Sequence, residues 1–236
     1  MQRDKNFFSN PGLFVLLFIL FFLHGITQTM QQFNMYNDVE ITIDIPGNYL
    51  ATRKTIIILY ALRNGNTTEQ TMGKKINSGD DWHYDIQDIK AQTAFIRNEM
   101  EKENFVVAYP ENNFKSWPAW KTKHINYISE VQHSVDTIQN LFSSKQKVIY
   151  LNGHSGGGRF IFSYFDDIKE IPQNVERISF LDRDYGYDAT YLTKLKTWLQ
   201  QNKNAVLNVF AYNDSVALLN GKDLFQTQEE RGIAAT

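Results

Sequence analysis

The chain has 236 residues, of which 42% are hydrophobic and 14% aromatic, and its formal net charge is -2. This balance is typical of a folded globular protein that can bury a core without metals or disulfides, and it excludes a largely disordered chain. The mixed charges leave no basic stripe for nucleic acid, and the absence of Cys excludes disulfides, thiolate metal sites and cysteine nucleophiles.

The N-terminus has the outline of a signal peptide. Arg3 and Lys5 precede an uninterrupted apolar run from Leu13 to Leu23, and polar residues follow from Thr27. The run is too short to cross a bilayer as a helix, although no clean A-x-A cleavage site follows it. We therefore expect residues 1–28 to be a signal peptide and residues 29–236 to be one mature domain that is secreted or periplasmic. An uncleaved signal that anchors the chain in the membrane is the alternative.

The first half of the mature chain alternates strands and helices. Val39 to Ile45 shows the period-2 pattern of an edge strand, and the continuously apolar run from Thr55 to Leu62 predicts a buried central strand. Apolar residues at helical spacing predict a helix from about Asp80 to Glu103, with Asp80 and Asp81 at its start. Phe105 to Tyr109 predicts a further buried strand that Pro110 closes.

The second half repeats this alternation. The remaining predicted helices cover residues 128–142, 159–165 and 190–201, and the remaining strands cover residues 147–151, 177–181 and 205–212. Strands and helices in this order predict the α/β class, with a mainly parallel, doubly wound sheet.

One motif points to chemistry. Gly153-His154-Ser155-Gly156-Gly157 matches G-x-S-x-G and lies between a predicted strand and a predicted helix, which is the context of a nucleophile elbow. In such an elbow the serine occupies a strained turn and the flanking glycines let strand and helix approach. We therefore predict that Ser155 is a nucleophile at the C-terminal edge of the sheet and that the Gly156 amide faces a developing oxyanion.

The order of elements and the G-H-S-G-G motif resemble the α/β-hydrolase superfamily of serine esterases and lipases over roughly residues 39–220. The resemblance implies a small-molecule or glycan-linked ester substrate and a reaction that needs neither metal nor cofactor. It also implies a second oxyanion donor at Gly65 or Asn66, in the loop after Thr55 to Leu62. Asp214 is expected to be the triad acid, with Asp182 and Asp184 as the alternative.

The chain departs from this family in its general base. The family histidine follows the acid, whereas no histidine follows His154 in this sequence. A serine without an adjacent base is a weak nucleophile. We therefore expect a chain that is truncated at its C-terminus, without the last strand and helix. The competing hypothesis is a non-catalytic hydrolase-fold protein that binds ligands.

Aromatic and histidine residues outside the motif allow two interpretations. Trp117 and Trp120 can form an aromatic wall over a substrate pocket or anchor a loop in the core. The histidines do not form a metal ligand set, and His154 is expected to point away from Ser155 in a structural role. Of the others, His83 is the one that could approach the site.

Overall fold

The computed structural model describes residues 28–182, 187–211, 218–219 and 222–223. Its strands are β1 (Thr29–Tyr36), β2 (Val39–Ile45), β3 (Thr55–Ala61), β4 (Asn104–Asn112), β5 (Lys147–His154), β6 (Val175–Leu181), β7 (Val206–Phe210), β8 (Leu218–Leu219) and β9 (Lys222–Asp223). Its helices are α1 (Thr68–Met72), α2 (Ile89–Glu99), α3 (Trp117–Lys123), α4 (Tyr127–Asn140), α5 (Gly158–Asp167) and α6 (Ala189–Gln201), with short 3-10 turns η1 (Trp82–Asp85) and η2 (Ser155–Gly157).

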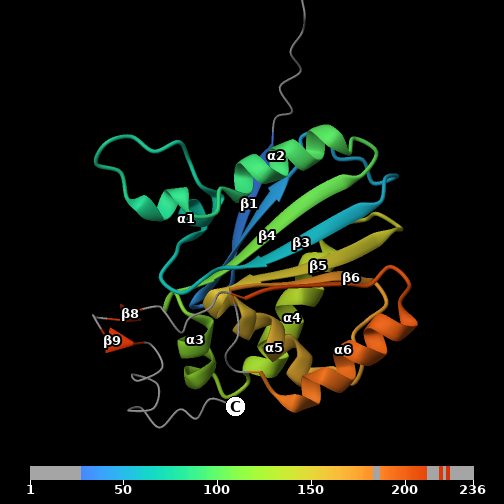
Figure 1. The fold of residues 1–236 in the computed structure, drawn as a ribbon. Coiled ribbons are helices and arrows are strands. Elements are labelled where there is room, and N and C mark those ends of the chain that lie inside the picture. The colour runs from blue at the N-terminus through green and yellow to red at the C-terminus, as the bar shows by residue number, and fades with distance from the viewer. Residues whose placement is uncertain (1–27, 183–186, 212–217, 220–221, 224–236) are drawn as a thin grey trace, which may run out of the picture.

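The main sheet has the order β1-β2-β4-β3-β5-β6-β7. The five strands β4, β3, β5, β6 and β7 are parallel to one another. β1 and β2 form an antiparallel hairpin, and β2 pairs antiparallel with β4. Figure 1 shows α1 and α2 on one side of this sheet and α3, α4, α5 and α6 on the other. The expected α/β class, with a mainly parallel sheet and helices on both faces, is confirmed.

Two hydrophobic clusters fill the space between the sheet and its helices. The larger cluster lies under α3 to α6 and includes Val135, Ile138, Phe160, Phe165 and Trp198. The smaller lies on the α2 face and includes Ile56, Ile58 and Tyr109. Among the described residues, no helix is long and apolar enough to span a membrane.

The edge of the sheet differs from the prediction. β2 is an interior strand, because the unpredicted β1 pairs outside it. Two of its polar residues, Thr42 and Asp44, are buried as well: Asp44 is 0% exposed and accepts a hydrogen bond of 2.9 Å from the Arg97 guanidinium of α2. An alternating pattern therefore predicts a solvent-exposed strand face only where the polar side chains have no hydrogen-bond or ion-pair partner in the interior.

Two boundaries are corrected, and two helices that the sequence did not predict, α1 and α3, are added. The predicted helix from Asp80 to Glu103 is divided into η1 and α2, because the backbone turns left-handed at Asp88 (φ 46°). Asp81 caps η1 by accepting from the His83 amide at 3.0 Å. β4 continues through Pro110 to Asn112, and α3 begins after Ser116, whose hydroxyl accepts from the Ala119 amide.

Candidate functional site

The strand-to-helix junction at Ser155 has the geometry of a nucleophile elbow. β5 ends at His154, and Ser155 adopts a left-handed conformation with φ 48° before the chain turns into α5. A methyl group on Gly153 would lie 2.9 Å from Gly158 Cα, and one on Gly157 would lie 2.1 Å from the Ala61 carbonyl oxygen in β3. Glycine is therefore required on both sides of the serine, as expected for a nucleophile elbow.

Asp182 lies at the same edge of the sheet. His154 of β5 is paired with Leu181 of β6, so Ser155 and Asp182 follow neighbouring positions in two parallel strands. Asp182 is also left-handed, with φ 52°, and its amide donates a hydrogen bond of 2.6 Å to the Phe210 carbonyl of β7. Asp214 and Asp184 lie outside the described residues. Of the aspartates considered from the sequence, Asp182 is therefore the one that the structure places beside the serine.

The loop after β3 reaches the elbow through Asn64. A methyl group on Gly156 would lie 1.8 Å from the Asn64 side-chain oxygen and 2.7 Å from its nitrogen, so the carboxamide packs directly on Gly156. The predicted donors in this loop have partners: the Gly65 amide donates to the Lys115 carbonyl at 2.8 Å, and the Asn66 amide donates to the Arg63 carbonyl at 3.3 Å. The sequence did not predict a role for Asn64 in the site, although Asn64 precedes Gly65 in the same loop.

His154 points onto the α2 face of the sheet. Its Nδ1 lies 2.8 Å from Gln87 Nε2, and that nitrogen also lies 2.7 Å from the Tyr60 hydroxyl. These residues line an open hollow of about 340 Å³. Burial and the nearby Arg63 lower the pKa of His154 below its ordinary value, against an opposing effect of Asp182. A ring that accepts from the Gln87 amide is neutral, which agrees with the expected structural role.

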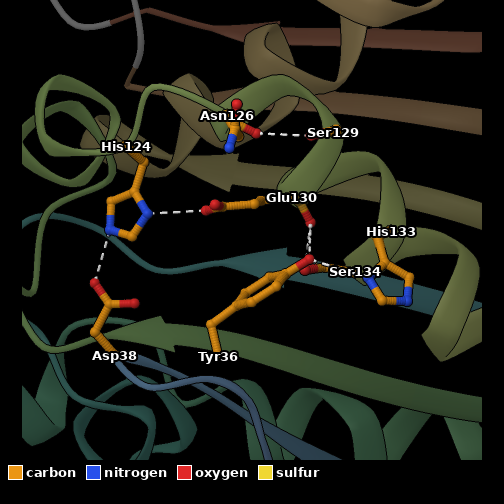
Figure 2. Close-up of polar contacts among 8 residues, drawn as sticks. All are labelled: Tyr36, Asp38, His124, Asn126, Ser129, Glu130, His133 and Ser134. Carbon is orange, nitrogen blue, oxygen red and sulfur yellow. Dashed lines mark hydrogen bonds and ion pairs between the residues drawn. The ribbon is translucent and has the colours of Figure 1, made fainter.

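The other described histidines have carboxylate or hydroxyl partners. His83 Nδ1 lies 2.6 Å from an Asp81 carboxylate oxygen, and its ring stacks on Trp82. His133 Nδ1 lies 3.1 Å from the Tyr36 hydroxyl. Figure 2 shows His124 between two carboxylates, with Nε2 2.8 Å from Asp38 and Nδ1 2.8 Å from Glu130.

Trp117 and Trp120 are core residues of α3. They are 3% and 1% exposed, and their rings meet edge to face with centroids 5.1 Å apart. Trp117 also packs against Phe160 of α5 at 4.7 Å. The structure therefore supports the core alternative, because Trp117 packs between α3 and α5 and Trp120 is buried beside it.

Within the part of the chain that the structure describes, no group of three His, Asp or Glu side chains could hold a metal ion. The candidate site consists instead of the strained serine, the Asn64 carboxamide against Gly156, and the exposed Asp182 at the next strand end.

Comparisons with known proteins give only distant likenesses. No family model matches the sequence, and no curated protein matches it. A solved structure described as an α/β-hydrolase fold protein of unknown function matches 66% of this chain and 44% of its own, with 9% identity and a TM-score of 0.35. A predicted CIB-like hydrolase from Thermoplasma acidophilum matches 80% of this chain and 89% of its own, with 10% identity and a TM-score of 0.38. The chain thus spans under half of the first protein, and neither transfers an activity to it.

Proposed function

We propose that this protein is an exported serine hydrolase that acts on an ester or related acyl substrate. The observation that carries the proposal is the left-handed Ser155, held at φ 48° between glycines that no other residue can replace. Such strain costs a non-glycine residue roughly 1–3 kcal/mol and persists mainly where function requires it. A serine raised on this turn projects its hydroxyl from the sheet toward a substrate.

The proposed reaction is acyl transfer through Ser155. The Ser155 oxygen forms a bond to the acyl carbon, its proton passes to a general base, and the carbon–oxygen bond to the leaving alcohol breaks after that alcohol receives the proton. Water then releases the acid. In this proposal the Gly156 amide stabilises the oxyanion, and the Asn64 carboxamide, which packs on Gly156, supplies the second donor.

The carboxylate of the proposed mechanism comes from outside the elbow. Asp182 follows the strand beside Ser155 and is the carboxylate that the described geometry favours, with Asp214 as the alternative from the resemblance. In the mature protein, residues 1–28 would be removed as a signal peptide, and N-terminal sequencing of the exported protein tests this.

The histidine contacts favour a second candidate. All four described histidines have ring nitrogens within hydrogen-bond distance of Gln87, Asp81, Tyr36 or a carboxylate pair, which is the arrangement of structural residues. A hydrolase-fold protein that binds ligands without turnover would retain the elbow and lack an activated serine.

Ester hydrolysis by the natively exported protein separates the two candidates. We expect release of 4-nitrophenol from 4-nitrophenyl acetate, loss of that activity in Ser155→Ala, and unchanged activity in Ser129→Ala, which removes an exposed serine of α4. Equal activity in the two variants would show that Ser155 is not the nucleophile, and no activity in the parent protein would favour the binding protein.

A further inference from the structure

A second open groove lies on the α3 side of the molecule, at the end of α3 away from the core. It has a volume of about 710 Å³, and its lining includes Lys121, Lys123, Ile125, Tyr127 and Arg159. The volume is within the range of sites that take small organic ligands. Because α3 also packs against η2 and Arg159 lies in the first turn of α5, this groove is close to the elbow.

The groove is positively charged. Its described lining includes Lys121, Lys123 and Arg159 but no carboxylate. Lys121 is partly neutralised, because its ammonium group donates to Asp166 at 3.1 Å and lies 4.2 Å from the centre of the Tyr127 ring. Lys123 and Arg159 have no ion pair with another residue of the described chain. Two positive charges therefore line the groove without an ion pair to a described side chain.

The position of Arg159 is not explained by helix stability. The N-terminal end of a helix carries partial positive charge, so an arginine in the first turn is unfavourable there, and α5 has no acidic residue in that turn. Lys121 and Lys123 differ, since cations at the end of α3 favour that helix. An external anion would compensate both Arg159 and the helix end.

His124 fixes the wall that carries Lys123 and Ile125. Its two ring nitrogens are bonded to Asp38 and Glu130, as Figure 2 shows, and its ring stacks on Trp120 with centroids 4.1 Å apart. These contacts hold the connection between α3 and α4 against the turn between β1 and β2, the first turn of α4 and the buried Trp120. Ile125, the next residue, is 95% exposed and supplies an apolar surface beside the charges.

We infer that this groove binds a small organic anion, with a carboxylate, sulfate or phosphate against Arg159 and Lys123 and a hydrocarbon part against Ile125. The inference rests on the proposed function in one respect: if Ser155 is an acyl-transfer nucleophile, the anion is the acidic group of the ester substrate. The ligand class then becomes esters of acidic compounds rather than neutral ones.

Benzoate and benzamide test this groove, because they share a ring and differ in charge. Binding to the full chain is measured by NMR titration at low ionic strength. We expect benzoate to shift the amides of residues 121–127 and to bind at least about tenfold more tightly than benzamide, since hydrogen bonds to charged groups contribute that much. Arg159→Gln and Lys123→Gln should each weaken benzoate binding by about tenfold, and added salt should weaken it further.

Lys102→Gln is the matched control, because Lys102 is an exposed lysine in the turn between α2 and β4. Equal affinities for benzoate and benzamide, or equal losses in Arg159→Gln and Lys102→Gln, would overturn the inference. If Ser155 reacts with a fluorophosphonate but the protein does not bind benzoate, anion binding in the groove is refuted and the proposed hydrolase activity is not. Benzoate binding beside an unreactive Ser155 would support the groove and refute the hydrolase.

Discussion

Glycine at position 155 should give a more stable protein than alanine at the same position. Ser155 is held at φ 48°, where a side chain costs roughly 1–2 kcal/mol in contact with its own backbone. Glycine avoids this cost but loses about 0.5–1 kcal/mol more conformational entropy on folding than alanine does. The difference favours Gly over Ala at position 155 by about 0.5–1 kcal/mol, which corresponds to an increase of about 1–4 °C in Tm.

The comparison is between Ser155→Gly and Ser155→Ala. Both variants lose the hydroxyl and its interactions, so the difference between them reports the backbone strain. The free energy of unfolding is measured by urea denaturation followed by tryptophan fluorescence. Ala94→Gly is the control, because Ala94 is exposed within α2, where glycine should be less stable than alanine by about 1 kcal/mol.

We expect glycine to be more stable than alanine at position 155 and less stable than alanine at position 94. If glycine destabilises position 155 relative to alanine as it does position 94, the turn is not strained and the elbow interpretation loses its main support.

Three further predictions concern packing and charge. Gly157→Ala should destabilise the protein by more than about 2 kcal/mol in urea denaturation, because the new methyl would lie 2.1 Å from the Ala61 carbonyl oxygen; a loss below about 0.5 kcal/mol would contradict the close packing. Arg97→Met should cost about 3–5 kcal/mol by leaving Asp44 buried without its partner, and Asp44→Leu in the same chain should recover much of that loss, whereas no recovery would argue against the pair. Burial opposes ionisation of Asp166, but hydrogen bonds from Tyr and Lys side chains outweigh it and hold its pKa below the ordinary value, so stability should be lost as pH falls below about 4. Asp166→Asn should reduce that loss, and an unchanged pH profile would refute this origin.

The sheet and the elbow could be predicted from sequence because their signals are local. Continuous apolar runs such as Thr55 to Leu62 identify strands buried on both faces, and the glycines around Ser155 identify a turn that only small residues permit. These patterns depend on neighbours within a few positions along the chain.

The features that sequence did not predict depend on distant partners. β2 was expected at the edge because Asp44 looks solvent-exposed in sequence, whereas Arg97 of α2 satisfies it in the interior. Trp117 and Trp120 allow two interpretations because their burial depends on partners elsewhere in the chain, such as Phe160 of α5 for Trp117. Asn64 had no distinguishing pattern, since its contact with Gly156 joins segments far apart in the chain.

The central claim is that Ser155 is an activated nucleophile, and fluorophosphonate labelling tests it most directly. The protein is treated with the probe, and its intact mass is compared with that of Ser155→Ala treated in the same way. We predict one adduct in the parent protein and none in the variant. A parent protein that gains no adduct, or a Ser155→Ala variant that still gains one, would contradict the assignment.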